Sequence, residues 1–180
     1  MKKYNIIYAD PPWKFKVWSK NLGKNGRCPD KHYSTMTIDD IKNLSIPSAE
    51  NCVLFLWVTF PMLPEGLDVI SSWGFTYRTC AFTWAKSTLD GSKFPIGLGY
   101  WTRANPEICL LATKGRIIRV NKGVRNLVIS PRREHSRKPD EIRKYIVDLV
   151  GDLPRIELFA REKIDGWDAW GNEVESDIEL

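Results

Sequence analysis

The stretch Tyr4-Asn-Ile-Ile-Tyr-Ala-Asp-Pro-Pro-Trp13 decides how the rest of the chain is organised. Its first six residues are mostly apolar and favour β structure, which predicts a buried strand over residues 4–9. Pro11 and Pro12 must end this strand, because neither can donate a hydrogen bond to a neighbouring strand. We therefore expect a rigid turn at the carboxyl end of a strand, which is where open α/β sheets bind their ligands.

The turn at residues 10–13 offers a carboxylate, carbonyl oxygens and an aromatic face. Acceptors of this kind suit an amino group, such as the exocyclic amine of a nucleic-acid base. Hydrogen bonds to Asp10 and to the Pro11 carbonyl would hold the lone pair of the amine toward an electrophile. Trp13 would stack on the base, which is worth about 1–3 kcal/mol. The alternative interpretation is a strand that simply ends in Asp-Pro-Pro.

Length and composition indicate a single domain over residues 1–180. The longest apolar run, residues 52–58, is far too short to cross a membrane, and no secretory signal opens the chain. The four cysteines are scattered, without a CxxC pair, which predicts free thiols. Two histidines and no cluster of ligands predict that there is no metal site. We expect a cytosolic protein.

The net charge of +5 is unevenly distributed along the chain. Residues 14–32 contain six basic side chains against Asp30 alone, and residues 114–144 contain eleven against three acidic ones. Beyond residue 144 the sign reverses, with ten acidic residues against three basic ones. A charged run is usually a solvated face, but two basic blocks, one of them next to the candidate catalytic turn, favour a polyanionic substrate.

Predicted strands alternate with helical segments of about ten residues, a pattern that indicates βαβ units. We therefore predict an α/β fold, Rossmann-like, with a largely parallel sheet and helices on both faces. The predicted strands after the first are 51–59, 75–86, 106–113, a hairpin within 115–130 that turns around 121–123, and 155–160. The predicted helices begin after Thr37, at residue 63 and at residue 139.

No glycine-rich turn follows the first strand, where dinucleotide-binding folds usually carry one. Gly97-Leu-Gly99 is only weak evidence for a phosphate-binding loop. If a nucleoside-like cofactor binds, its pocket must be built from later elements. A chain order rotated relative to the usual one, with the catalytic turn before the cofactor-binding elements, would do this.

Nearly end to end, the chain resembles the MT-A seventy (METTL-type) adenine N6-methyltransferases, which use S-adenosylmethionine. Asp10-Pro-Pro-Trp13 resembles the family's catalytic tetrapeptide, which implies catalytic roles for Asp10, Pro11, Pro12 and Trp13. An ordered series of further blocks makes the resemblance much stronger than a lone tetrapeptide. These blocks are His32–Met36, 38–47, Leu54–Thr59, Phe82–Lys86, Glu107–Gly115, Ser136–Ile142, Ile156–Arg161 and Gly171–Glu173.

The resemblance implies a cofactor site made of five residues. Asp10 would face both the charged methionine end of S-adenosylmethionine and the target amine. Lys138 matches a lysine that pairs with the cofactor carboxylate, and Arg161 matches an arginine at the ribose end. Asn172 and Glu173 match the pair near the adenosine. The simpler alternatives are a solvated helix-start lysine, a surface ion pair of Arg161 and an ordinary turn at Asn172.

The resemblance also implies a substrate side. Tyr33 and Arg133 match residues that line the target base, although Tyr33 also suits a core position. The loops 14–31 and 86–103 are the candidates for gripping phosphates and closing over the base. The substrate-binding residues expected there are Lys14, Lys16 and Arg103.

These observations lead to one functional hypothesis with alternatives. The chain is expected to transfer a methyl group to the N6 amine of adenine in DNA, because its small size looks more like bacterial or phage family members. The expected location is therefore the cytoplasm of a bacterium or of a phage-infected cell. The alternatives are N6 of RNA adenine, N4 of cytosine, or an inactive subunit that only binds nucleic acid. By analogy with the family, a homodimer is also expected.

Overall fold

The computed structural model describes residues 2–14, 36–97, 99, 101–133 and 137–180. Seven strands form one sheet in the order β5-β3-β4-β2-β1-β6-β7. The strands are β1 (Tyr4–Ala9), β2 (Ser48–Val58), β3 (Thr76–Ser87), β4 (Glu107–Lys114), β5 (Leu127–Pro131), β6 (Arg155–Leu158) and β7 (Asp168–Trp170). The helices are α1 (Ile38–Lys42), the 3-10 helix η3 (Phe60–Met62), α2 (Leu63–Ser72) and α3 (Glu141–Val150).

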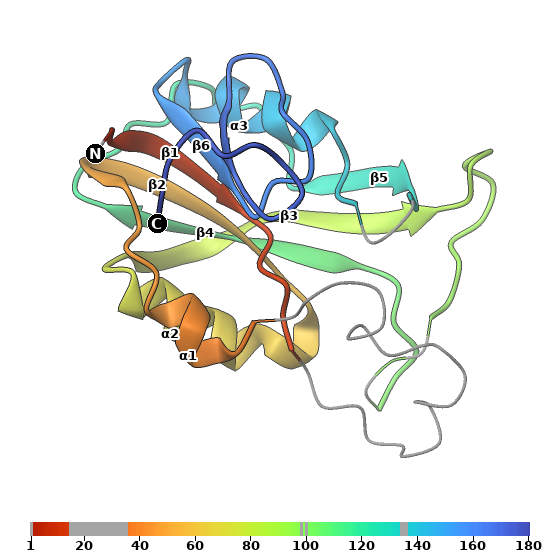
Figure 1. Ribbon diagram of the computed structural model, residues 1–180. Coiled ribbons are helices and arrows are strands. Elements are labelled where there is room, and N and C mark those ends of the chain that lie inside the picture. Colours follow the sequence, from red (N-terminus) through yellow and green to blue (C-terminus); the bar gives the residue numbers. More distant parts are fainter. Residues whose placement is uncertain (1, 15–35, 98, 100, 134–136) are drawn as a thin grey trace.

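Only β4 runs antiparallel to its neighbours, and the other neighbouring strands pair in parallel. Helices α1 and α2 lie on one face of the sheet and α3 lies on the other (Figure 1). This arrangement confirms the predicted Rossmann-like α/β fold with a largely parallel sheet and helices on both faces.

Strand β1 lies inside the sheet and is apolar except for Asn5, because both of its faces are covered. Ile7 and Ala9 pack into the cluster that contains α1 and α2, whereas Ile6 and Tyr8 pack into the cluster that contains α3. All four side chains are at most 2% exposed. A strand buried on both faces can end only where polar groups can be satisfied, and β1 ends at Asp10.

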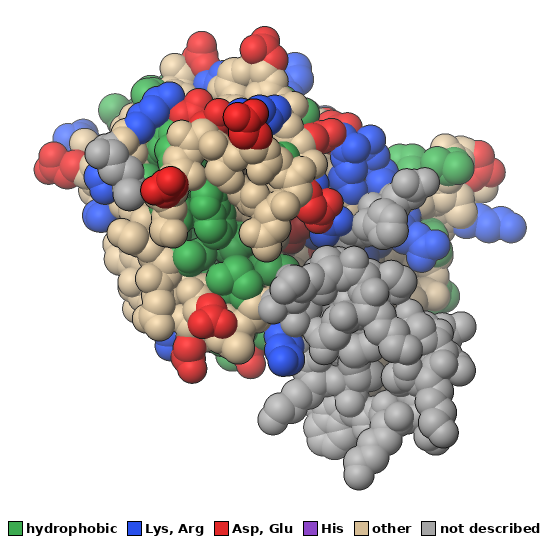
Figure 2. All heavy atoms as spheres, viewed as in Figure 1, with side chains coloured by type: hydrophobic (Ala, Val, Ile, Leu, Met, Phe, Trp, Pro, Cys, Tyr) green, Lys and Arg blue, Asp and Glu red, His purple; other side chains and the backbone are tan. Residues whose placement is uncertain are grey.

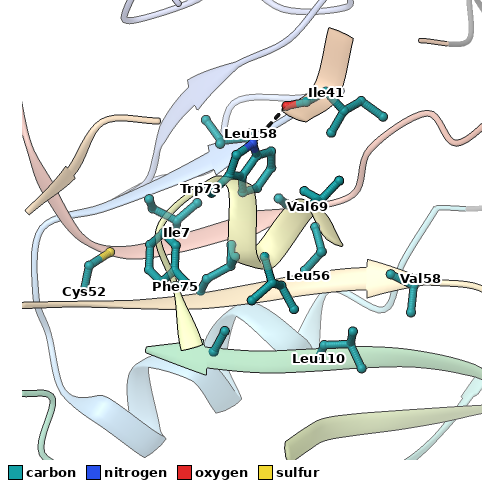
Figure 3. Packing of buried hydrophobic residues seen from close by; sticks show 14 of the residues in the cluster. Ile7, Ile41, Cys52, Leu56, Val58, Val69, Trp73, Phe75, Leu110 and Leu158 are labelled. Atoms are coloured by element: carbon teal, nitrogen blue, oxygen red, sulfur yellow. Dashed lines mark hydrogen bonds between the residues drawn. The ribbon is translucent and has the colours of Figure 1, made fainter. Parts of the chain in front are cut away.

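Trp73, at the end of α2, connects the two helices on the first face. Its indole N–H donates to the carbonyl of Ile41 in α1 over 2.9 Å, while its ring packs beside Val69 and Phe75 (Figure 3). Trp73 is only 5% exposed. The hydrogen bond therefore lies in a dry environment and fixes α1 against α2.

The helix boundaries follow the signals in the sequence. Thr37 caps α1, since its side chain accepts from the N–H of Asp40 and the carboxylate of Asp40 reaches back to Thr37. Helix α2 stops before Gly74, which has a φ of 76°. Helix α3 follows Pro139 and Asp140 and stops at Gly151. The three predicted helices are confirmed.

The predicted hairpin within residues 115–130 is wrong. Only β5 forms there, and it pairs in parallel with β3. The N–H groups of Val120 and Asn121 donate to the carbonyl of Leu149 at the end of α3, over 2.9 and 3.3 Å, so they are not used in a strand pair. Ile118 and Val120 are both more than 60% exposed, so this segment lacks the buried face that a strand pair needs.

The short strand β7 was not predicted from the sequence. Three residues are too few to show an alternating pattern, and β7 is held by pairing with β6. No helix in the described part of the chain is long and apolar enough to span a bilayer.

Strand directions bring several segments of the chain to one edge of the sheet. Strands β1, β3, β5 and β6 run the same way, so their carboxyl ends meet at that edge, together with the first residue of β4. Both chain ends lie on the other side, at the left of Figure 1. The candidate catalytic turn is therefore surrounded by residues from five different strands.

Replacing Trp73 by Phe should lower the free energy of unfolding by about 1–3 kcal/mol, because it removes the buried hydrogen bond and part of the ring volume. Urea unfolding measures this change. The matched control is Trp101→Phe, which alters a 99% exposed ring and should stay within about 0.5 kcal/mol of wild type. Equal effects of the two substitutions would contradict this account of the helix pair.

Candidate active site

Asp10 is held at the carboxyl end of β1 by an ammonium group. Lys138 Nζ lies 2.8 Å from Asp10 Oδ2 and 3.2 Å from Glu107 Oε2. Lys86 Nζ, from the end of β3, lies 2.6 Å from Glu107 Oε1. The four side chains form a line of alternating charge, acid–base–acid–base, which crosses the sheet edge from β1 to β3.

The network is largely removed from water. The side chain of Lys138 is 9% exposed and that of Glu107 is 11% exposed, while the Asp10 side chain keeps 26%. The ammonium of Lys138 also lies 5.5 Å from the centre of the Trp57 ring. Buried charges of this kind require one another, because an unpaired buried charge is strongly destabilising.

Burial and pairing shift the three pKa values of this network in different directions. Burial raises the pKa of Asp10 above its usual value, and Lys138 offsets this only in part. Burial also disfavours charge on Glu107, but the ammonium groups of Lys138 and Lys86 outweigh it and lower that pKa. Burial lowers the pKa of Lys138, but the carboxylates of Asp10 and Glu107 outweigh burial and raise that pKa. The lysine is therefore a permanent cation, and Asp10 is a stronger base than an exposed aspartate.

The backbone of the turn is fixed by its own hydrogen bonds. The carbonyl of Pro11 accepts from the N–H of Trp13 over 2.8 Å, and the carbonyl of Pro12 accepts from the N–H of Met36 over 3.2 Å. A carbonyl oxygen has two lone pairs, so each retains the capacity to accept a second bond.

Trp13 anchors this turn to the core. Its ring is 6% exposed, and its indole N–H donates to the carbonyl of Trp57 over 2.9 Å. Trp57 in turn donates to the hydroxyl of Tyr8 over 2.8 Å. The structure thus gives Trp13 a packing role, and its stacking on a base stays a prediction.

A cavity of about 710 Å³ opens beside Asp10 and Lys138. Its walls come from the ends of β1, β5 and β6 and from the start of α3, and Figure 2 shows acidic and basic side chains side by side in the region between α3 and β5. The volume falls in the range of pockets for small organic ligands. The lining residues are Tyr8, Asp10, Leu89, Arg132, Arg133, Arg137, Lys138, Arg143, Glu157, Phe159, Arg161, Glu162 and Glu173.

Ion pairs stiffen the wall of the cavity. Arg143 contacts Glu157 through two nitrogens, at 2.6 and 3.0 Å, and both side chains are 12% exposed. Arg137 pairs with Glu162. Such a bidentate pair fixes the guanidinium plane, so this wall keeps its shape without a ligand.

Phe159 follows β6 in a left-handed backbone conformation, with a φ of 62°. Residues other than glycine adopt this conformation rarely, and such cases cluster at functional sites. The ring of Phe159 meets Trp170 edge to face, with centroids 5.3 Å apart. The packing of the two rings holds an apolar surface against the otherwise charged cavity.

Five of the thirteen residues proposed for the site lie around one cavity. Asp10, Lys138, Arg161, Glu173 and Arg133 all line the cavity. Arg161 Nε lies 3.7 Å from Glu173 Oε1, and Arg133 pairs with Asp140.

Other proposed residues lie elsewhere. Asn172, Arg103 and Lys14 are exposed and are not among the residues that line the cavity. Their binding roles stay predictions. Lys16 and Tyr33 lie outside the described residues.

Sequence reasoning missed the second half of the charge network. Glu107 and Lys86 lie inside blocks that were used for the resemblance, but neither received a role. The available signal was a carboxylate directly before the apolar run 108–112 and a lysine after the run 81–85. Charged residues at the ends of apolar strands point to the edge of a sheet, where ligands bind.

Fold and site together define a class of protein: an α/β domain with a partly buried carboxylate and a cavity of small-ligand size at the carboxyl edge of its sheet. The family model of MT-A70 matches residues 4–173, so the chain belongs to the MT-A70 family of methyltransferases. Methyltransferases of this family use S-adenosylmethionine. Within the described residues, no three His, Cys, Asp or Glu side chains are grouped so that they could hold a metal ion.

The relatives include bacterial and eukaryotic proteins. The type II methyltransferase M.MunI of Mycoplasma sp is 34% identical over 190 residues, which cover 96% of this chain and 78% of the relative. The human N(6)-adenosine-methyltransferase catalytic subunit METTL3 is 29% identical over 96% of this chain but only 28% of its own length. A Medicago truncatula putative N(6)-adenosine-methyltransferase is 30% identical, with 26% of its length covered.

Replacing Glu107 by Gln should lower the free energy of unfolding at pH 7 by about 2–4 kcal/mol, because two ammonium groups lose their shared carboxylate. The pKa of Glu107 is lowered in the folded state, so its stabilisation is present above pH 4.5 and is lost as pH falls through the folded pKa. The difference between wild type and variant should therefore shrink below pH 4.5. Urea unfolding at several pH values measures it.

The control is Asp148→Asn on α3, which breaks the exposed pair with Lys144. That change should cost about 0.3–0.5 kcal/mol. A Glu107→Gln variant as stable as this control, or a difference from wild type that does not depend on pH, would contradict the structural role of the network.

Proposed function

We propose that this chain transfers a methyl group from S-adenosylmethionine to the N6 amine of adenine in DNA. The observation that carries the proposal is the Asp10 carboxylate, which Lys138 holds at the edge of a nucleoside-sized cavity. Resemblance to a type II methyltransferase over 78% of that protein's length supports the choice of DNA.

The residues of the cavity fit S-adenosylmethionine. The cofactor carries a carboxylate, an ammonium, a ribose and an aromatic adenine ring, and the cavity offers side chains that suit each of them. We assign its amino-acid end to Asp10 and Lys138, its ribose end to Arg161, and its adenosine to Asn172 and Glu173. The bound cofactor supplies an electrophilic methyl group, so the protein needs no metal or covalent nucleophile.

The protein's contribution is to present the amine. The Asp10 carboxylate and the Pro11 carbonyl accept hydrogen bonds from the two N–H groups of the target amine. These hydrogen bonds direct the lone pair of the amine toward the methyl group. Holding reactants in such alignment removes on the order of 7–11 kcal/mol from a barrier. Transfer would form the nitrogen–carbon bond while the methyl–sulfur bond breaks and the neutral thioether of S-adenosylhomocysteine leaves. Positive charge would then grow on the amine, and Asp10 would stabilise that charge. The raised pKa of Asp10 also suits it to take the proton that the amine loses.

The substrate side combines cations with the catalytic turn. Arg132 and Arg133 line the cavity mouth beside β5, and Lys14 follows the catalytic turn directly. We assign to these side chains, with Arg103, contacts to phosphates. In duplex DNA the target adenine must leave the stack, at a cost of a few kcal/mol. A homodimer stays a proposal made by analogy with the family.

RNA adenine is the second candidate substrate. The eukaryotic relatives are named N(6)-adenosine-methyltransferases, and the chain aligns with about a quarter of their length. We rank RNA below DNA because the type II methyltransferase is the more similar relative, with 34% identity against 30% and 29%.

Replacing Asp10 by Asn should lower the rate of methyl transfer at least 100-fold, because it removes the charge that faces the amine. The measurement is incorporation of labelled methyl groups into unmethylated duplex DNA. Asp148→Asn, an exposed carboxylate on α3, is the matched control and should keep the wild-type rate. Wild-type turnover by Asp10→Asn would rule out this assignment of the catalytic residue.

The same substitution should not weaken the fold. The pKa of Asp10 is raised in the folded state, so wild type loses stability relative to Asp10→Asn as pH rises from below 3.8 through the folded pKa. At pH 7 the variant should therefore be at least as stable as wild type. Thermal unfolding of both proteins at pH 4 and pH 7 measures this, and a variant that is clearly less stable at pH 7 would contradict the assigned shift.

A further inference from the structure

Trp101 lies on the surface, on the connection between β3 and β4. It has no role in the function proposed above. Its ring is 99% exposed, more than any other large apolar side chain in the described part of the chain. Its backbone has a φ of 70°, a left-handed conformation that residues other than glycine rarely adopt. The stability of the fold does not account for an aromatic residue that is both strained and exposed, and this combination points to a contact with another molecule.

The segment that carries Trp101 is anchored on both sides. Gly97 and Ala104 exchange two backbone hydrogen bonds, of 2.7 and 3.3 Å. The side chain of Asn105 donates to the carbonyls of Lys86 and Pro95, at 2.9 and 2.6 Å, and accepts from the N–H of Lys86 at 2.9 Å. The described residues on both sides of Trp101 are therefore tied to one another and to the end of β3.

Gly99 shows how tight this turn is. A Cβ placed at Gly99 would lie 2.0 Å from the carbonyl oxygen of Thr102 and 2.7 Å from the nitrogen of Ala104. Only glycine fits at that distance. The chain thus folds back on itself at Gly99 and projects Trp101 outward.

The turn lies at the active edge of the sheet. It connects the carboxyl end of β3 with the start of β4, and both lie at the edge where β1 ends in Asp10. The connection extends beyond the sheet at the right of Figure 1, in yellow-green and green. Asn105 clamps the backbone of Lys86, whose ammonium belongs to the charge network, and Leu89 lines the cavity.

The surroundings of Trp101 suit a nucleic acid. Lys93 and Arg103 are exposed on the same connection. Its one acidic residue among those described, Asp90, has its carboxylate bound by Thr88 and Ser92. Cations that flank an exposed aromatic ring are the usual combination for phosphates and a stacked base.

We propose that Trp101 inserts into duplex DNA beside the target adenine and stacks on the base that is uncovered when the adenine leaves the helix. The inference rests on the proposed function, since it needs a duplex substrate from which a base is extruded. Wedge residues of this type stabilise unstacked steps. Because single-stranded DNA needs no unpairing, the contribution of Trp101 should be specific to duplex substrates.

The experiment compares wild type with Trp101→Ala and Trp101→Phe on an unmethylated linear plasmid and on its separated strands. Trp101→Ala should lower methyl incorporation into the duplex about 10-fold or more and into single strands less than about 3-fold. Trp101→Phe, which keeps an aromatic face, should fall between wild type and Trp101→Ala. Ile118→Ala, another exposed apolar residue, is the control and should match wild type on both substrates.

Different outcomes separate this inference from the function on which it rests. Three outcomes would refute the wedge and leave the methyltransferase assignment intact. They are equal losses of activity on duplex and single strands, no loss of activity at all, and a wild-type enzyme that is active only on single strands. Loss of self-association by Trp101→Ala in light scattering, with duplex activity falling in proportion, would place a second copy of the chain on the ring instead. If the wild-type protein methylates no DNA, both the wedge role of Trp101 and the proposed function are refuted.

Discussion

The contact of the Lys138 ammonium with Asp10 and Glu107 is the interaction on which the active edge depends. It joins β1, β4 and the approach to α3, which are far apart in the chain. Lys138 and Glu107 are too buried to remain charged without a partner, so the fold must bring them together. Once it does, the Asp10 carboxylate is fixed at the end of a strand whose position is set by packing on both faces.

The same interaction explains why the site carries an energetic cost. Glu107 is stabilised in its ionised form, whereas Asp10 is kept partly exposed and less acidic than usual. The folded protein would be more stable with a neutral Asp10, but the proposed chemistry needs the Asp10 charge near the amine. Phe159 and Trp101, both in left-handed backbone conformations, extend this pattern to the two sides of the edge. Strain and buried charge therefore gather at the edge where ligands are proposed to bind.

Local signals in the sequence were sufficient for much of the fold. The apolar run before Asp10, the cap at Thr37 and the stop at Gly151 predicted elements that the structure contains. The interval 115–130 was misjudged because its apolar residues suggested a hairpin, while its backbone bonds to the end of α3, a long-range contact that no local pattern reveals. The sequence shows Glu107 and Lys86 at the ends of apolar runs, but it does not show their ion pairs. Those pairs form only when β4 lies between β2 and β3.

The most direct test of the central claim is to identify the methylated nucleoside. Purified protein is incubated with labelled S-adenosylmethionine and, separately, with unmethylated duplex DNA, single-stranded DNA and RNA, and each product is digested and analysed by mass. We expect N6-methyladenine from DNA with the wild-type protein and none with Asp10→Asn. N4-methylcytosine, label confined to RNA, or no transfer to any pool despite bound cofactor would contradict it.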